Sequence, residues 1–139
     1  EVVYNMNNVD NCCLEKLLKV IDILQKNANN SDCFDESCTR PYLGSAPNII
    51  CFNTRPVSFY TKNGSLFTAT YTLNGVTNSS SVFRIEGVNN CCVKCRILRA
   101  NPDTSDINRA YLATNEFITI NLNCICVVTC LNDIIIDNL

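Results

Sequence analysis

Residues 116–131 read Glu-Phe-Ile-Thr-Ile-Asn-Leu-Asn-Cys-Ile-Cys-Val-Val-Thr-Cys-Leu and alternate for most of their length. Successive side chains of a strand point to opposite faces, so the pattern predicts β-structure with one apolar, cysteine-bearing face. That face would carry Ile118, Ile120, Leu122, Cys124, Cys126, Val128 and Cys130. At roughly 3.3 Å per residue the run is long for one strand. A bend or tight turn is therefore expected at residues 123–125.

Upstream, one stretch has the period of a helix and the remainder has the period of strands. Residues 11–26 place leucine and isoleucine at helical spacing, which predicts an apolar stripe that packs on a sheet. The stripe consists of Leu14, Leu17, Leu18, Ile21 and Leu24. Alternation predicts strands at residues 57–61, 66–73, 82–88, 91–99 and 109–114, before the run at 116–131.

Turn signals separate these strands. Asn63-Gly64 predicts a hairpin, whereas Asn74-Gly75 is expected to begin a polar connection through Ser81. In the strand that follows, Phe83 and Ile85 should face inward, and Arg84 and Glu86 outward. We therefore predict a mainly β fold, an antiparallel β-sandwich with one N-terminal α-helix packed against it or at its edge.

The expected domain organisation is simple. Residues 1–10 form a flexible N-terminal arm, either a frayed terminus or a tether to a neighbouring subunit. Residues 11–139 form a single cysteine-rich domain, in which residues 31–48 form a loop.

Composition excludes several function classes. The net charge of −2 and the absence of a basic run argue against nucleic-acid binding. No apolar run approaches the roughly 20 residues that span a bilayer, so no membrane partner is expected. The chain contains no histidine, the usual base for a cysteine nucleophile, and its carboxylates are scattered. We expect neither an enzyme nor a bound cofactor, and we assign no catalytic residue.

The eleven cysteines leave at least one sulfur free or paired with another chain, because their number is odd. Cys92 and Cys95 have the CxxC spacing of half a zinc site, but a second such knuckle is absent. On an extended strand Cys126 and Cys130 would lie roughly 13 Å apart, too far for one tetrahedral centre. We therefore expect no metal site and interpret the cysteines as a means of cross-linking.

Two vicinal pairs, Cys12-Cys13 and Cys91-Cys92, indicate where cross-links could leave the domain. Neighbouring strand residues face opposite ways, so one sulfur can face the core and the other a second molecule. Cys92 shares parity with Lys94 and Arg96 and is the predicted outward member. The alternative is that both sulfurs of each pair are small buried hydrophobes.

A second motif is Asn53-Thr54-Arg55-Pro56. Pro56 cannot donate to a strand ladder, so the motif should begin a strand at an edge or corner. Arg55 precedes proline and is biased to extended geometry. Its guanidinium either bridges to a carboxylate such as Glu86, within the chain or across subunits, or remains solvated.

Together these segments resemble the cysteine-rich spore coat protein Y/Z and exosporium protein ExsY family of Bacillus endospores. The matching blocks run in the family's order. They are Arg40-Pro-Tyr-Leu-Gly44, Asn53-Thr-Arg-Pro56, Tyr60-Thr-Lys-Asn-Gly64, Ser81-Val-Phe-Arg-Ile-Glu86, residues 92–98 and Leu122-Asn-Cys-Ile-Cys-Val-Val-Thr-Cys-Leu131.

The resemblance implies a structural protein that self-assembles into a disulfide-cross-linked ordered sheet in the outer coat, crust or exosporium. Its partner would be itself, in hexameric rings joined into sheets, together with other spore coat or exosporium proteins. It would be made in the mother-cell cytoplasm. The alternative function is a secreted, disulfide-rich binding module that forms no lattice.

On this interpretation the cysteines fall into two groups. The candidate inter-subunit cysteines are Cys12, Cys13, Cys33, Cys38 and Cys92. The candidates for internal disulfides or buried thiols are Cys51, Cys91, Cys95, Cys124, Cys126 and Cys130. Cys95, Cys124 and Cys126 are placed inside because they share parity with apolar residues.

Overall fold

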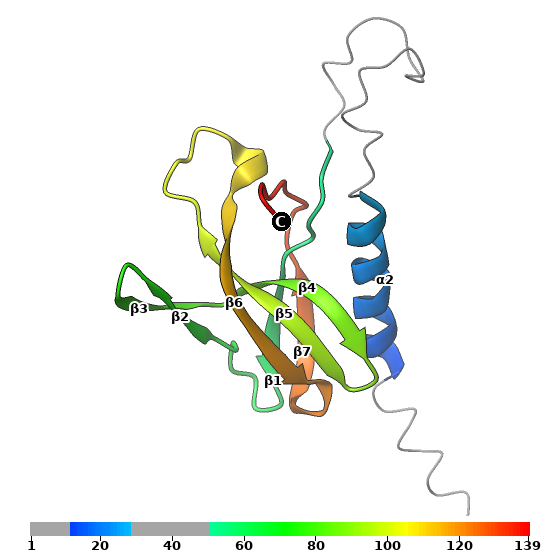
Figure 1. Cartoon of the computed structure of the whole chain (residues 1–139). Coiled ribbons are helices and arrows are strands. Elements are labelled where there is room, and N and C mark those ends of the chain that lie inside the picture. The colour runs from blue at the N-terminus through cyan, green and yellow to red at the C-terminus, as the bar shows by residue number, and fades with distance from the viewer. Residues whose placement is uncertain (1–11, 29–50) are drawn as a thin grey trace, which may run out of the picture.

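A computed structural model describes residues 12–28 and 51–139 of the chain (Figure 1). Helix α2 spans Cys12–Ala28, and the seven strands are all antiparallel. The strands are β1 Val57–Thr61, β2 Ala69–Leu73, β3 Val76–Ser80, β4 Val82–Asn89, β5 Cys92–Ala100, β6 Tyr111–Asn121 and β7 Ile125–Cys130. Short 3-10 helices, η2 at Ile107–Arg109 and η3 at Leu122–Cys124, complete the described elements. The predicted class, mainly β with one N-terminal α-helix, is confirmed.

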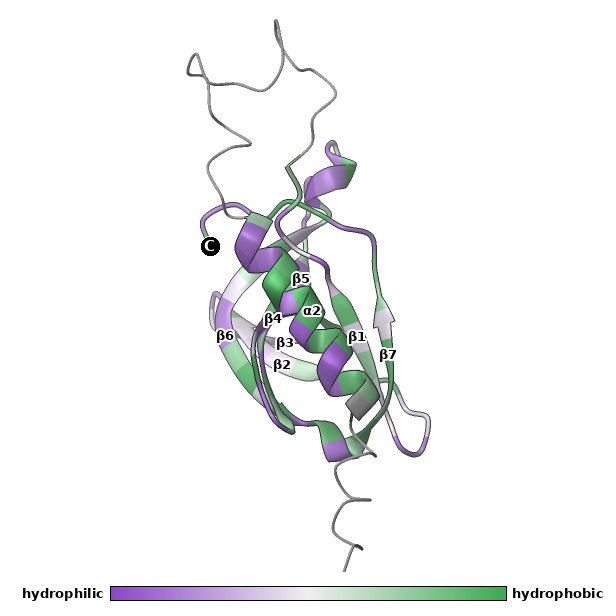
Figure 2. Cartoon of the chain, turned by 90° about the vertical axis from the view of Figure 1, so that its right-hand side faces the viewer, coloured by the Kyte–Doolittle hydropathy of each residue, from purple (hydrophilic) through white to green (hydrophobic). Residues whose placement is uncertain are grey.

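The strands form two sheets in a sandwich-like arrangement. One sheet has the order β6-β5-β4-β1-β7, and the β2–β3 hairpin forms the other. Strands β1 and β4 are in register only at Val57 and Phe83, so the two parts of the larger sheet separate beyond that pair. Viewed from the side of α2, β4 and β6 lie on one side of the helix and β1 and β7 on the other (Figure 2).

The main core lies between this curved sheet and α2. Leu18 and Ile21 of the helix are buried with Phe59, Phe83 and Ile85. The Phe83 ring centroid lies 5.7 Å from that of Phe59 and 5.7 Å from that of Phe67. Because Phe67 lies in the segment between β1 and β2, these ring contacts join that segment to the larger sheet. Burial of these apolar side chains is the main source of stability.

The helical stripe packs only in part. Leu17 and Leu24 are exposed, whereas Gln25, which the pattern left out, is buried. Gln25 can be buried in the interface between the helix and the sheet because it forms hydrogen bonds there with Ile85 and Arg55. No helix in residues 12–28 or 51–139 is long and apolar enough to cross a membrane.

The run at 116–131 bends where the sequence predicts. Strand β6 ends at Asn121, whose side-chain oxygen accepts a 2.9 Å hydrogen bond from the Asn123 backbone N–H and caps η3. Chain direction reverses through η3, and β7 begins at Ile125. The bend changes which residues face the core, because Ile125 is buried while Cys124 and Cys126 are exposed.

The expected polar connection after Asn74-Gly75 is wrong. Asn74 and Gly75 have φ of 52° and 79°, the left-handed pair that a two-residue hairpin turn requires. Strand β3 follows at once and pairs with β2 from Leu73↔Val76 to Ala69↔Ser80. The sequence pattern hid β3 because nearly all its residues are exposed, so neither face carries an apolar signal.

Candidate functional site: a polar junction and a set of surface thiols

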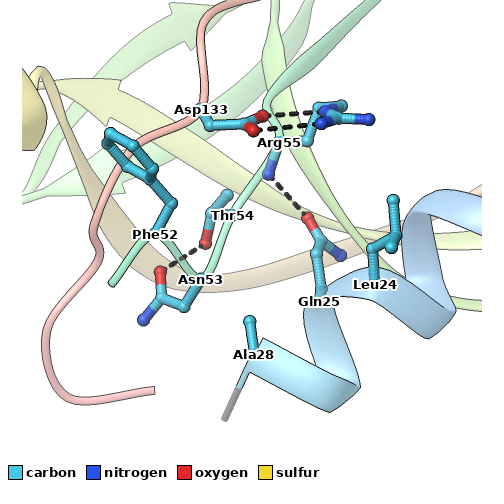
Figure 3. Close-up of a pocket in the computed structure, with 8 residues that line it drawn as sticks. All are labelled: Leu24, Gln25, Ala28, Phe52, Asn53, Thr54, Arg55 and Asp133. Carbon is cyan, nitrogen blue, oxygen red and sulfur yellow. Dashed lines mark hydrogen bonds and ion pairs between the residues drawn. The ribbon is translucent and has the colours of Figure 1, made fainter. Parts of the chain in front are cut away.

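The Asn53–Pro56 motif lies where α2, the start of β1 and the C-terminal segment meet (Figure 3). The Asn53 side-chain amide forms two hydrogen bonds with the backbone of the C-terminal segment. Its nitrogen donates to the Ile136 carbonyl at 2.9 Å, and its oxygen accepts from the Ile136 N–H at 2.9 Å. Beside it, the Ile134 N–H donates to the Thr54 carbonyl at 2.9 Å. The motif therefore binds the last residues of the chain like a short strand.

Gln25 connects the helix to this motif. Its side-chain oxygen accepts from the Arg55 N–H at 3.0 Å, and its nitrogen donates to the Ile85 carbonyl at 2.8 Å. The side chain is only 2% exposed, so both partners are needed to offset its desolvation. One glutamine thus fixes α2 against β4 and against the residue before Pro56.

Arg55 pairs with Asp133 rather than with Glu86, the carboxylate named from the sequence. Arg55 Nε lies 2.7 Å from Asp133 Oδ1 and Nη2 lies 3.0 Å from Oδ2, a two-pronged contact. The hydrogen bond with Asp133 raises the pKa of the Arg55 guanidinium. Glu86 is not the partner of Arg55 because its carboxylate already forms ion pairs with two other arginines.

Those two arginines are Arg84 and Arg96, and the outward placement predicted for Arg84 is wrong. Arg84 is 6% exposed and donates from Nε to Thr54 Oγ1 at 2.9 Å. Its Nη1 lies 2.8 Å from Glu86 Oε2, and Arg96 Nε lies 3.3 Å from the same oxygen. Arg84 is buried on the second face of β4 because residues 53 and 54 cover it.

Pro56 directly precedes β1, so the motif begins a strand as predicted, but β1 lies between β4 and β7 rather than at an edge of the sheet. The Pro56 carbonyl accepts from the Leu131 N–H of the C-terminal segment at 2.8 Å. The cavity at this junction is lined by Leu24, Gln25, Ala28, Phe52, Asn53, Thr54, Arg55 and Asp133 (Figure 3). Its polar side chains already bind one another. We therefore interpret the motif as a structural junction that ties the helix, the sheet and the C-terminal segment together.

We expect Arg55→Ala to lower the free energy of unfolding by at most about 1 kcal/mol, because both partners are more than a third exposed. Urea unfolding of the reduced protein measures the change. Asp133→Asn should produce a similar loss, and the double variant should lose little more than either single change. Strictly additive losses would contradict the pairing.

The second functional feature is the distribution of thiols. Cys13, Cys92, Cys124, Cys126 and Cys130 are exposed and unbonded, Cys91 is half-buried and Cys95 is buried. Cys51 is disulfide-bonded. Only the helical backbone of Cys12 is described, and Cys33 and Cys38 lie outside the described residues.

The internal placement of Cys124, Cys126 and Cys130 is therefore corrected, because all three are exposed and none forms a disulfide. Parity failed at the turn, where η3 interrupts the alternation. The register with β1 also shifts between Tyr60 and Thr61, which pair with Val127 and Ile125, so Cys126 faces no β1 residue. The one-residue slip takes Cys126 out of the alternation. Cys130 lies beyond the slip, opposite buried Val57, and is exposed at the end of the edge strand.

The vicinal pair Cys91-Cys92 also differs from the strand-based prediction. Asn90 has a φ of 55°, and Cys91 lies in the turn before β5 rather than in the strand. Its sulfur consequently contacts that of Cys92. The charge that Cys91 carries when ionised, followed by its hydrogen bond to Cys92, raises the pKa of the Cys92 thiol.

Cys95 lies on the core face, as its parity predicts. Burial, and secondly the charge of Glu86, raises the pKa of its thiol to about 12. A neutral buried thiol is a poor nucleophile, so Cys95 is unsuited to cross-linking while the domain is folded.

Three of the five exposed thiols lie in or beside the segments at one end of the molecule. The first turn of α2, the β4–β5 turn and the β6–β7 turn lie at the same end, away from the C-terminus (Figure 1). The Leu122 N–H donates to the Cys91 carbonyl at 2.8 Å and joins the last two of these turns. Cys13 lies in the first turn of α2, Cys92 begins β5 directly after its turn and Cys124 lies in η3. Cys130, by contrast, ends β7, opposite Val57.

Among residues 12–28 and 51–139, no group of three or more histidine, cysteine or acidic side chains is placed to hold a metal ion. The arrangement instead presents separate thiols to solvent. Such thiols can form disulfides with thiols of another molecule if their Cα atoms come within about 7 Å.

Comparison with known protein families assigns most of the chain. Residues 4–112 match the family described as Spore coat protein Z. No curated protein and no solved structure matches the chain. The match includes the Asn53–Pro56 junction, β1 to β5 and the vicinal Cys91-Cys92 pair. Since it spans well over half of the chain, the chain belongs to the Spore coat protein Z family.

Proposed function

We propose that this spore coat protein is a structural subunit that assembles with copies of itself and is then hardened by disulfides between subunits. Membership of the family supports a structural role in the coat at the spore surface. The cross-linking proposal rests on five thiols that are exposed and form no disulfide, in contrast to the buried thiol of Cys95.

The order of events follows from chemistry. A protein made in the reducing mother-cell cytoplasm begins with its surface thiols reduced. Disulfides form only between cysteines that are already close, so non-covalent contacts must place the subunits first. Hexameric rings joined into sheets would supply such placement, because one repeated contact closes a ring and a second contact joins rings. Oxidation would then make the assembly resistant to denaturants.

The layer and the partners are part of the same proposal. A disulfide-hardened sheet suits the outermost layers, the coat crust or the exosporium, where exposure to oxidants is greatest. Exposed thiols beyond those used between copies would allow links to other spore coat or exosporium proteins. A relationship to coat protein Y and ExsY would fit this placement.

The test compares the full chain with a variant in which Cys13, Cys92, Cys124, Cys126 and Cys130 are serine. Both should form the same ordered oligomers under reducing conditions, seen by electron microscopy and sedimentation. After oxidation, only the wild type should run as a ladder on a non-reducing denaturing gel. Only the variant's oligomers should dissolve in denaturant without reductant. Cys95→Ala is the matched control and should keep the ladder, because its thiol is buried.

Two outcomes would overturn the proposal. A wild type that forms no ordered oligomer while reduced would mean that disulfides build the assembly rather than harden it. A wild type that stays a compact monomer band after oxidation would favour the alternative, a disulfide-rich binding module without a lattice.

A further inference from the structure

Strand β7 forms one edge of the five-stranded sheet among the described elements. Its inner side pairs with β1, as Thr129 opposite Ser58 and Val127 opposite Tyr60. The Leu131 N–H points to β1, where it donates to the Pro56 carbonyl at 2.8 Å. Backbone groups alternate along an antiparallel strand, so those of Val128 and Cys130 point away from β1, toward the open edge.

Apart from the bulge beside Cys126, this edge has, within the described part of the chain, none of the features that usually prevent strands from pairing between molecules. The sequence of β7, Ile-Cys-Val-Val-Thr-Cys, contains no charged residue and no proline. Val127 is 43% exposed on it. Soluble proteins ordinarily protect such an edge with lysine, proline, a covering segment or a very short strand. An unprotected edge that carries two exposed thiols is suited to pairing with another strand.

The spacing of the thiols selects the partner. Cys126 and Cys130 lie symmetrically about Val128, two residues to either side. An antiparallel pairing with a second copy of β7, centred on Val128, would place Cys126 opposite the partner's Cys130. Twofold symmetry would repeat this pair. Registers centred on Cys126 or Cys130 would pair one thiol with itself, leave the other without a thiol opposite and shorten the paired stretch.

The backbone geometry agrees with this register. Outward N–H and C=O groups at Val128 and Cys130 make these positions hydrogen-bonded pairs, in which Cα atoms lie about 5.5 Å apart. Disulfides span Cα separations of about 4.4 to 6.8 Å. Cys126 has no β1 partner in the register, because the bulge between β1 and β7 lies beside it. We propose that β7 pairs edge to edge with β7 of a second copy and that two symmetric Cys126–Cys130 disulfides lock the contact.

The chemistry needs an oxidant, for which a small-molecule disulfide such as oxidised glutathione suffices. The Cys126 thiolate attacks one sulfur of the oxidant, forms a mixed disulfide and releases one small thiol. The thiolate of the partner's Cys130 then attacks the Cys126 sulfur and releases the second small thiol. Each protein disulfide thus consumes one oxidant disulfide, and two protons leave the protein thiols for the two small thiols.

The inference deepens the proposed function and rests on it, because it names one contact of the assembly. The thiols at the end of the molecule that holds the β4–β5 and β6–β7 turns, Cys13, Cys92 and Cys124, are left for other contacts. A twofold contact along β7, combined with a second contact at those turns, would extend the assembly beyond a dimer.

The experiment uses the full chain with Cys13, Cys92 and Cys124 replaced by serine, so that Cys126 and Cys130 are the fully exposed thiols left among the described residues. Oxidised glutathione should convert this background protein to a covalent dimer on a non-reducing gel. Adding either Cys126→Ser or Cys130→Ser should lower the dimer at least tenfold. Mixing the two single variants should restore the dimer to about half of the background level, because half of random pairs are heterodimers with one disulfide.

A second variant tests the strand pairing itself. Val128→Pro removes an N–H that points away from β1, a position where an edge strand tolerates proline. The folded variant should lose the covalent dimer while keeping both thiols. Circular dichroism provides the check on folding, and a folded Val128→Pro protein that still forms the dimer would contradict the pairing.

Other outcomes separate the two proposals. If either single variant keeps its dimer, or if the mixture yields none, the Cys126–Cys130 pairing is wrong. If the background protein forms no dimer while the wild type still forms a ladder, this inference fails and the proposed function stands. If the wild type forms no ladder either, the proposed function fails first.

Discussion

Phe83→Ala should lower the free energy of unfolding by about 3–5 kcal/mol, the largest loss we expect from a single substitution. Phe83 is completely buried, and its ring contacts Phe59 and Phe67 with centroids 5.7 Å apart in both cases. Alanine removes these aromatic contacts and leaves a cavity between β4, β1 and the approach to β2. Urea unfolding of the reduced protein would measure the loss.

The matched control is Phe117→Ala. Phe117 is 42% exposed on β6. Its ring centroid lies 4.9 Å from Lys94 Nζ and 4.4 Å from Arg96 Cζ. Its removal should cost about 1 kcal/mol or less, because a partly exposed cation–π contact contributes little. Equal losses at Phe83 and Phe117 would mean that the core does not lie where the structure places it.

Arg84→Ala should cost about 3 kcal/mol, although arginine is seldom a stabilising core residue. The loss comes from the partners left behind. Thr54 Oγ1 and the Asn53 carbonyl lose their donor, and Glu86 retains only Arg96, at 3.3 Å. Buried polar groups without partners carry their desolvation cost in full.

Arg99→Ala controls for the loss of an arginine from the same sheet, because Arg99 forms no ion pair with the described residues. It should change stability by less than about 0.5 kcal/mol. Thermal unfolding of both variants in the presence of reductant would measure the two stability changes. A loss at Arg84 no greater than that at Arg99 would show that the junction contributes little to stability.

The two large effects come from adjacent residues on opposite faces of β4, and they illustrate what a sequence pattern contains. Alternation correctly predicted Phe83 as a core residue. The same alternation predicted a solvent-facing Arg84, because a pattern of period two distinguishes the faces of a strand but does not reveal what covers each face. Residues 53 and 54, about 30 positions away along the chain, cover the second face.

The thiols show the same division. Cys95 was correctly placed in the core because β5 is regular through it. Cys124 and Cys126 were placed in the core by counting parity through a turn, and η3 together with the shift at Cys126 moved them to the surface. Parity is reliable within one strand only, since a single extra residue reverses every side chain that follows.

Sequence patterns alone were enough to predict the fold class, the N-terminal helix, the bend in residues 116–131 and the resemblance to spore coat proteins. These features depend on local periodicity, turn residues and short motifs, all of which are read along the chain. Other features emerge only once the chain is folded: Arg55 pairs with Asp133, 78 positions away, and Glu86 pairs with Arg84 and Arg96. The position of β7 at a sheet edge with two exposed thiols is another such feature. Such contacts depend on how the strands are ordered and covered. That order is set by the packing of the whole core, so no local pattern specifies it.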